Sequence, residues 1–369
     1  MNKSYKFTSD KKYLLISSFL GNKERHGGVK RSDQVNELFE DFDCKSCNPY
    51  LSFRLSIKKA FKYPFIFLDS LIFSLFYISK GLSLKGVILF SFKSVEIIKF
   101  INSNKDREIV LDGGGNVPII LMNYLNFKKI EFCSFCHNIE YLVPERTIFN
   151  YFRSNKDKYD LEIKGYNKSN SIFTISELDS AILGCHGIPS ELINYYPCKK
   201  DFKSLNKIRK FRIENSLYKD NGHALLLGTV LNPPTKAGML NAIKSFKEQK
   251  CIYPLKVAGY GTDVFKEFNS KYIKVFGSVS DEELNSLIKN AKFLIINQVQ
   301  TSGFLTKIVD FNIAGVPIFV TSNYYQATYL QKYGVFKVHY SDIPKLFNSK
   351  ILDENFRIFK RPTFNYSLN

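Results

Sequence analysis

The segment 300–321, QTSGFLTKIVDFNIAGVPIFVT, carries the residue types and the spacing expected of a nucleotide diphosphate site. A polar turn with a glycine comes first, and an amphipathic helix pattern follows in which Lys307 and Asp310 lie one turn apart. Backbone amides at a helix start attract anions, and a carboxylate one turn later can accept hydrogen bonds from a ribose hydroxyl pair. We therefore expect Lys307 to contact a phosphate and Asp310 to contact a ribose. The other residues expected around the diphosphate are Thr301, Ser302, Gly303, Phe304 and Thr306.

Glycine and small polar residues follow the strand-like segments in the second half of the chain. Ligands of open α/β sheets bind beyond the carboxyl ends of the strands, where glycine lets the backbone approach a ligand closely. Several successive strand-like segments are followed by such residues, which is stronger evidence for a ligand site than any single glycine. We expect this edge to cradle the nucleotide, with Lys236 as a second phosphate partner beside Lys307. The residues concerned are Gly228, Thr229, Lys236, Gly259, Gly261, Gly277 and Val279.

Three turns in the first half contain candidate acceptor-binding and catalytic residues. Gly27 and Gly28 follow the first strand and either bring amides to a phosphate or sugar or form an ordinary flexible turn. Asp112 ends a later strand and either contacts a hydroxyl, acts as a base, or caps the next helix. His137 and Glu140 follow the next strand and predict a substrate contact, with a structural histidine as the alternative. We take Asp112, His137 and Glu140 as the candidate catalytic residues.

The order of elements that carries these turns predicts an α/β fold. Short apolar runs alternate with helix patterns twice over, which indicates two parallel sheets with right-handed crossovers, and so two Rossmann-like domains. We expect an N-terminal domain over 1–200, a linker over 201–221, a C-terminal domain over 222–345, and a tail over 346–369 that returns to the N-terminal domain. The expected strands are 13–18, 87–92, 108–111, 130–135 and 171–175, then 223–227, 255–258, 272–276, 293–296 and 318–321.

The net charge of +19 over 369 residues admits three kinds of anionic partner: nucleic acid, lipid headgroups and a phosphorylated substrate. The lysines are spread along the chain and form no basic arm, so no nucleic acid partner is expected. The start of the sequence does not resemble an export signal, which predicts a cytoplasmic location.

The seven cysteines predict neither a disulfide framework nor a metal site. Two CxxC pairs, Cys44 with Cys47 and Cys133 with Cys136, are spaced too far apart for the usual zinc ribbon. In a strand, Cys133 and Cys136 would point to opposite faces. We interpret them as buried or incidental thiols and expect no metal.

The segment 61–78, FKYPFIFLDSLIFSLFYI, departs from the alternation because it is apolar on all sides. It is interrupted by Asp69 and is short for a membrane-spanning helix. We favour a buried core helix. The alternative is an interfacial helix on the inner face of the cytoplasmic membrane, with the preceding basic residues on anionic lipid.

These motifs, in this order, resemble the GT-B glycosyltransferases, in particular the bacterial group 1 (GT4-like) family. The resemblance covers nearly the whole chain, and its most specific part is the terminal pattern of a glycine, Lys307, Asp310 and a Gly-Val-Pro triplet. That family has two acidic positions around the diphosphate loop, and this chain has Ser302 at the first and Asp310 at the second. The motifs that carry the resemblance are Gly27-Gly28, His137-Asn138-Ile139-Glu140, Leu226-Leu227-Gly228, Val257-Ala258-Gly259-Tyr260-Gly261, Phe276-Gly277-Ser278-Val279 and 302–317.

The resemblance implies two Rossmann-like domains facing a cleft, with the nucleotide sugar on the C-terminal domain and the acceptor on the N-terminal domain. It implies transfer of a sugar from a UDP-, GDP- or similar donor to a glycan or lipid-linked oligosaccharide during synthesis of capsule, O-antigen, other lipopolysaccharide or exopolysaccharide. No metal or other cofactor is implied. If the reaction inverts the sugar, a base is needed and Asp112 is our choice, whereas a retaining reaction needs none. The alternatives are a nucleotide-sugar epimerase of the same architecture and a non-catalytic, basic surface-binding relative.

Overall fold

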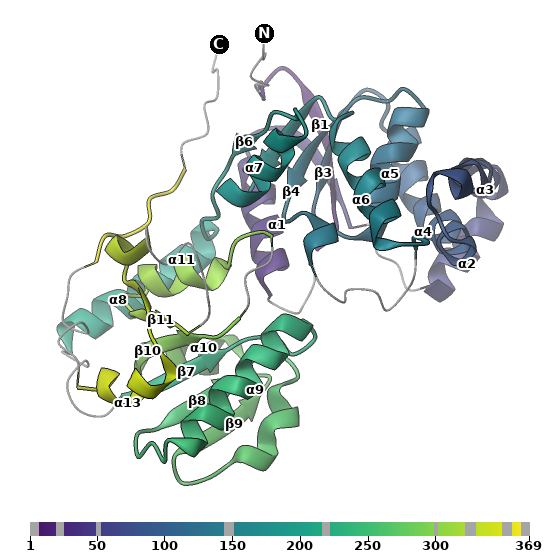
Figure 1. Ribbon diagram of the computed structural model, residues 1–369. Coiled ribbons are helices and arrows are strands. Elements are labelled where there is room, and N and C mark those ends of the chain that lie inside the picture. The colour runs from purple at the N-terminus through teal and green to yellow at the C-terminus, as the bar shows by residue number, and fades with distance from the viewer. Residues whose placement is uncertain are drawn as a thin grey trace. The chain divides into compact units, whose positions relative to one another are not determined.

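The computed structural model describes residues 7–19, 26–48, 53–143, 151–215, 222–298, 302–321, 330–348 and 356–362. The chain divides into two compact units, each built on a parallel sheet (Figure 1). Unit 1 comprises Met1–Tyr195, Ser302–Phe304 and Pro362–Asn369, and unit 2 comprises Tyr196–Thr301 and Leu305–Arg361. The predicted α/β class with two Rossmann-like domains is confirmed.

Unit 1 contains a six-stranded parallel sheet in the order β2-β1-β3-β4-β5-β6. The strands β1, β3 and β4 lie side by side at its centre, so their carboxyl ends meet at one edge. Their apolar side chains are buried on both faces of the sheet, as expected when helices cover both faces. The strands are β1 (Lys12–Ser17), β2 (Asp43–Cys47), β3 (Glu108–Asp112), β4 (Phe132–Cys136), β5 (Ser171–Thr174) and β6 (Glu191–Leu192). The helices are α1 (Gly27–Leu38), α2 (Phe53–Lys62), α3 (Pro64–Phe76), α4 (Leu84–Asn102), α5 (Asn116–Phe127), α6 (Asn155–Tyr166) and α7 (Glu177–Cys185).

Unit 2 contains a second six-stranded parallel sheet, in the order β12-β11-β10-β7-β8-β9. Its central strand β10 is buried along its whole length and pairs with β7 on one side and β11 on the other. The strands are β7 (His223–Leu227), β8 (Leu255–Ala258), β9 (Ile273–Gly277), β10 (Ala291–Ile296), β11 (Ile318–Val320) and β12 (Val335–Lys337). The helices are α8 (Lys199–Glu214), α9 (Pro233–Glu248), α10 (Asp281–Lys289), α11 (Thr306–Ile313) and α13 (Ile343–Leu346).

Helix α8 begins two residues before the segment 201–221 that was expected to be a linker, and its buried Arg212 helps to fix it on unit 2. The side chain of Arg212 is 1% exposed and donates to carbonyl oxygens at the end of α10, at the start of β10 and just after α11. Its donors reach Lys289 at 3.0 Å, Ala291 at 2.6 Å and Gly315 at 3.2 Å. Carbonyls at helix ends have no partner within their own helix, so this one guanidinium satisfies groups that would otherwise be buried without hydrogen bonds.

The predicted strand over 87–92 is wrong, because these residues lie inside the 19-residue helix α4. Ser83 caps this helix by accepting a hydrogen bond from the Gly86 amide at 2.9 Å. The helix packs against α2, α3 and α5, so apolar residues occur on several of its sides and hide the helical period. The strands β2, β6 and β12 and the helix α6 were not predicted.

The favoured interpretation of 61–78 as a buried core helix is wrong for one face of the segment. The residues form the end of α2 and all of α3, which lie at the margin of unit 1 beside α4 (Figure 1). Phe73 is fully buried, whereas Phe61 and Phe65 are 82% and 85% exposed. Among the described residues no single helix is long and apolar enough to span a membrane, and only the bent pair Arg54–Lys62 with Pro64–Lys80 meets these criteria jointly.

Candidate functional site

Three neighbouring strand ends of unit 1 bring Ser17, Asp112 and His137 into direct contact. Ser17 and Asp112 are the last residues of β1 and β3, and His137 follows β4 immediately. The Ser17 hydroxyl donates to Asp112 Oδ2 at 2.6 Å, and His137 Nε2 lies 2.7 Å from Asp112 Oδ1. The sequence placed Asp112 and His137 at strand ends, and the strand order makes them a hydrogen-bonded pair.

Asp112 is buried and ionised. Burial by itself would raise the pKa of this carboxyl, but the electrostatic attraction of His137 and the hydrogen bonds from His137 and Ser17 hold the pKa below its ordinary value. The alternative role, a cap on the next helix, is wrong because the residue at that cap is Gly115. The ionised Asp112 therefore accepts a hydrogen bond from the protonated nitrogen of His137.

The hydrogen bond to Asp112 sets the tautomer of His137. An ionised carboxylate can only accept, so His137 Nε2 carries the proton and the neutral ring keeps its lone pair on Nδ1. Nδ1 is buried and has no hydrogen-bond partner among the described residues. The Phe19 ring stacks on the imidazole with a centroid distance of 5.7 Å and an interplanar angle of 21°. An oriented imidazole with an unused basic nitrogen is suited to act as a general base.

Gly27 and Gly28 form the first turn of α1. The Phe19 ring that stacks on His137 also contacts His26, the residue before this turn. His26 Nδ1 accepts a hydrogen bond from the Gly28 amide at 3.2 Å, so the His26 side chain caps this helix. A Cβ on Gly28 would lie 3.1 Å from the Phe19 ring, which explains the need for a small residue. The predicted contact of this turn with acceptor or phosphate stays a prediction.

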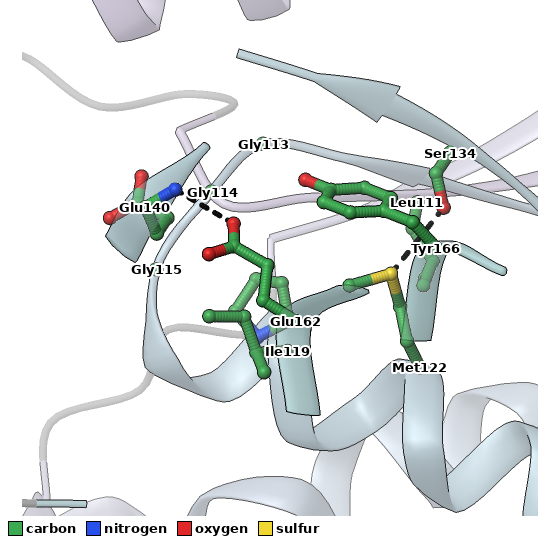
Figure 2. Close-up of a pocket in the computed structure, with 11 residues that line it drawn as sticks. Leu111, Gly113, Gly114, Gly115, Ile119, Met122, Ser134, Glu140, Glu162 and Tyr166 are labelled. Atoms are coloured by element: carbon green, nitrogen blue, oxygen red, sulfur yellow. Dashed lines mark hydrogen bonds between the residues drawn. The ribbon is translucent and has the colours of Figure 1, made fainter. Parts of the chain in front are cut away.

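Glu140 lies beside the glycine turn that follows Asp112, in a narrow pocket of unit 1 (Figure 2). Its Oε1 accepts a hydrogen bond from Asn138 Nδ2. A Cβ added to Gly114 would lie 2.2 Å from the same oxygen, so only glycine allows this approach. The pocket is lined by Leu111, Gly113, Gly114, Gly115, Pro118, Ile119, Met122, Ser134, Glu140, Glu162 and Tyr166.

Two residues of α6 hold the backbone around Glu140 in place. The carboxyl group of Glu162 accepts hydrogen bonds from the amides of Glu140 and Tyr141, at 2.7 and 2.9 Å. The Lys158 ammonium donates to the Glu140 carbonyl oxygen at 2.7 Å. The polar sequence of α6 hides this function, because Lys158 and Glu162 resemble an ordinary exposed ion pair at helical spacing until the helix is placed against the sheet.

Glu162 makes the stability of the protein depend on pH. Burial, and then the negative charge of Glu140, raise the pKa of Glu162 from 4.5 to about 8. Between these pH values the folded chain binds a proton that the unfolded chain has lost, so the free energy of unfolding falls as the pH rises. For Glu162→Gln we expect a flatter profile between pH 5 and pH 8, the two profiles diverging by on the order of a few kcal/mol in urea titrations.

The exposed Glu131 in the same unit provides the matched control, and Glu131→Gln is expected to follow the wild-type profile. Parallel profiles for wild type and Glu162→Gln would contradict the assignment of a protonated Glu162 at neutral pH.

The glycines at the strand ends of unit 2 are required by close backbone approach. A Cβ on Gly259, at φ +127°, would lie 2.0 Å from the Gly228 carbonyl oxygen. Gly261 and Gly277 also have positive φ, +75° and +79°. Because β7, β8 and β9 are parallel neighbours in the sheet, their carboxyl ends lie at one edge, and the nucleotide contact expected there stays a prediction. Thr229 and Val279 are partly exposed in the turns that follow.

Lys307 points at this edge. Its Nζ donates to the carbonyl oxygen of Leu227, the last residue of β7, at 3.0 Å. The side chain is partly exposed, yet burial of its ammonium lowers the pKa to about 8. No described carboxylate forms an ion pair with it. A cation without a fixed counter-ion at the end of a strand is suited to a phosphate.

The other predicted donor-site residues of unit 2 occupy different environments. Asp310 and Thr306 are buried in α11, at 2% and 8% exposure. Lys236 is exposed in the first turn of α9, after the Pro233 start of that helix. Their nucleotide contacts stay predictions.

The residues Ser302, Gly303 and Phe304 belong to unit 1. The Gly303 amide donates to both carboxylate oxygens of Asp179, at 3.0 and 3.1 Å, and the Ser302 hydroxyl donates to the Ile139 carbonyl oxygen at 2.8 Å. Burial raises the pKa of Asp179 to about 6. The sequence did not single out Asp179. The expected contact of these amides with a diphosphate stays a prediction, and Thr301 lies outside the described residues.

The seven cysteines all lie in the described ranges, and none of them forms a disulfide. Among the described ranges, no three side chains of His, Cys, Asp or Glu converge as metal ligands. Cys133 and Cys136 are buried in β4, where the sequence placed them in a strand. Cys44 and Cys47 lie in the unpredicted strand β2.

Comparison with solved structures shows that the fold is shared with proteins of low sequence identity. The structure of UDP-GlcNAc 2-epimerase from Methanocaldococcus jannaschii has a TM-score of 0.53 at 17% identity, covering 96% of each chain. HepE of Anabaena in complex with UDP-glucose has a TM-score of 0.58 at 13% identity, covering 93% of this chain and 90% of that one. A glycosyltransferase from Rickettsia africae has a TM-score of 0.51 at 15% identity, covering 91% and 87%. No protein-family model and no curated protein sequence matches the chain.

Proposed function

We propose that the chain is a glycosyltransferase that moves a sugar from a nucleotide-sugar donor to a hydroxyl of a glycan acceptor. The observation that carries the proposal is the basic Nδ1 of His137, held in its tautomer by Asp112 and left without a partner among the described residues. Hydroxyl groups are poor nucleophiles until a base removes their proton, so an oriented imidazole is what this reaction requires.

In the proposed mechanism His137 acts as the base of an inverting transfer. Nδ1 takes the proton from the acceptor hydroxyl while the hydroxyl oxygen forms a bond to the anomeric carbon of the donor sugar. The bond from that carbon to the diphosphate oxygen breaks, and the nucleoside diphosphate leaves. The resulting imidazolium is stabilised by the Asp112 carboxylate. This replaces our choice of Asp112 as the base, because both of its oxygens already accept hydrogen bonds.

The donor site that we propose lies at the strand ends of unit 2. Lys307 and Lys236 would stabilise the negative charge that develops on the leaving diphosphate, and Asp310 would orient the ribose. The glycines 228, 259, 261 and 277 would let the nucleotide approach the backbone. The structural neighbours with UDP-sugars in their names support a nucleotide sugar as donor.

The finer assignment follows the resemblance of the motifs to the group 1 glycosyltransferases. Under this assignment the chain is a cytoplasmic enzyme of surface-polysaccharide synthesis. It transfers the sugar to a glycan or a lipid-linked oligosaccharide and needs no metal. The basic charge of the chain, +19, suits an acceptor that carries phosphate.

A second candidate is a nucleotide-sugar epimerase, which needs no acceptor. It is favoured by two carboxyl groups, Glu140 and Glu162, that line one pocket, and by the neighbouring epimerase structure. Burial raises the pKa of Glu162, and a carboxyl group that holds its proton is suited to giving a proton to a substrate.

Product analysis with UDP- and GDP-sugars in deuterated water separates the two candidates. A transferase releases the nucleoside diphosphate only when a glycan acceptor is added, and the sugar gains no deuterium. Deuterium entering the donor sugar without acceptor would instead establish the epimerase. No conversion of any donor with any acceptor would favour a non-catalytic relative and would overturn the proposal.

A further inference from the structure

We propose that the outward face of α2 and α3 is a docking surface for an anionic membrane. This α2–α3 face has an apolar part and a basic part. The apolar side chains are those of Phe61, Phe65, Leu68, Ile72 and Phe76, and the basic side chains are those of Arg54, Lys58 and Lys62. It lies at the margin of unit 1, beside α4 (Figure 1). The docking is independent of the proposed sugar transfer, because it involves none of the candidate site residues.

The apolar side chains of the face are strongly exposed. Phe61 is 82%, Phe65 85% and Ile72 58% exposed. Along α3 the exposed residues Phe65, Leu68, Ile72 and Phe76 recur with the helical period, so they form one stripe. Isolated exposed apolar side chains are normal in proteins, but a stripe that includes several phenylalanines marks an interaction surface.

The opposite side of α3 fixes this orientation. Phe73 is fully buried and packs against Phe90 of α4 with a centroid distance of 6.0 Å. Ser70 shares a buried hydrogen bond with Ser94 of α4, at 2.5 Å between their hydroxyl oxygens. Rotating α3 to hide its exposed stripe would break this hydrogen bond and expose Phe73. The stripe is therefore a fixed feature of the folded unit.

The positive charge beside the apolar side chains favours an anionic membrane as the partner of this face. Arg54, Lys58 and Lys62 are exposed and occur every fourth residue on α2, on the side that also carries Phe61. Residues 53–88 include six Lys or Arg and a single acid, Asp69. That acid accepts hydrogen bonds from Tyr124 and Lys128, which offset its charge. Amphipathic helices with a basic flank and phenylalanines on the apolar side bind at the boundary of headgroups and acyl chains.

The bend between the helices suits a surface contact. The pair is bent by 111° between Lys62 and Pro64, with Phe61 and Phe65 on either side of the bend. Two phenylalanines at a bend can enter the interface together while the basic residues of α2 stay among the headgroups. Neither helix alone is long enough to cross the bilayer.

The chain has no tryptophan, so a single Phe65→Trp substitution in the full-length protein gives an unambiguous reporter. We expect its emission to shift to the blue on vesicles of phosphatidylcholine with phosphatidylglycerol, and to be quenched by lipids brominated on their acyl chains. Ile252→Trp, at a 65% exposed position of unit 2, is the matched control and should not respond. Equal emission of the Phe65→Trp protein with and without these vesicles would overturn the proposal.

Sedimentation with the same vesicles separates the apolar and the electrostatic contributions. We expect Phe61→Ser with Phe65→Ser, and Arg54→Gln with Lys58→Gln and Lys62→Gln, each to weaken binding at least about tenfold. The controls Ile252→Ser with Val264→Ser, and Lys244→Gln with Lys247→Gln and Lys271→Gln, remove equivalent exposed groups from unit 2 and should bind as wild type. Circular dichroism confirms that each variant is folded.

Three other results would overturn the proposal. The first is equal binding to pure phosphatidylcholine, which would mean that charge does not select the membrane. The second is unchanged binding by both α2–α3 variants. The third is a self-associating protein that becomes monomeric in the Phe61→Ser, Phe65→Ser variant and never binds vesicles, which would assign the face to a second copy of the chain.

Discussion

Replacing His137 by glutamine is expected to lower kcat for sugar transfer by about 10²- to 10⁴-fold. Glutamine can still donate a hydrogen bond to Asp112 from its amide, so the buried carboxylate keeps a partner. It has no basic nitrogen in the place of His137 Nδ1, so the proton of the acceptor hydroxyl has no group to receive it. The dissociation constant of the donor is expected to stay unchanged, since the lost interaction acts only during the reaction.

The exposed His186 of the same unit provides the matched control, and His186→Gln is expected to leave kcat unchanged. Asp112→Asn should lower kcat as well, because an amide can donate to the imidazole and favour the tautomer with its proton on Nδ1. Full activity of His137→Gln would show that the reaction needs no base at this position, as in a retaining transfer.

Replacing Lys307 by methionine is expected to weaken the binding of nucleoside diphosphates by about 10- to 100-fold, measured by isothermal titration calorimetry. Methionine keeps the length and apolar body of the side chain but removes the ammonium that would meet the phosphates. Because burial lowers the pKa of Lys307 to about 8, binding by the wild type should weaken as the pH rises above this value. The methionine variant should lose this pH dependence.

Stability separates a lost ligand contact from a damaged fold. An ammonium held away from water costs free energy, so Lys307→Met should melt at or above the wild-type temperature. Lys244→Met, at an exposed position on α9, is the control and should bind nucleotide as wild type. Unchanged affinity in Lys307→Met would remove Lys307 from the donor site.

Most strands of the two sheets could be predicted from the sequence, because they are short apolar runs between turn residues. The strand β8 begins and ends where the pattern placed it, and β7 does so too. The second half of α4, over 94–101, was predicted as a helix, but its first half could not be recognised, since its partners on several sides remove the polar face that reveals a helix. The exposure of Phe61 and Phe65 was also hidden, because sequence alone does not tell whether apolar residues have a partner.

The members of the site could be predicted better than their interactions. Strand ends are recognisable in a sequence, and Asp112 and His137 were found in this way. Their hydrogen bond depends on β3 and β4 being neighbours, which is a property of the sheet. Glu162 and Lys158 could not be found, because they come from a helix whose residues are mostly polar and whose packing alone places them under Glu140.

The central claim, that this chain binds a nucleotide sugar, is tested most directly by a thermal-shift screen. The ligands are UDP, GDP, CMP, dTDP and their sugar conjugates, at one low salt concentration. A ligand that binds only the folded state raises the melting temperature. We predict a selective rise with one nucleotide family that is reduced in Lys307→Met. No rise with any of these ligands would contradict the account.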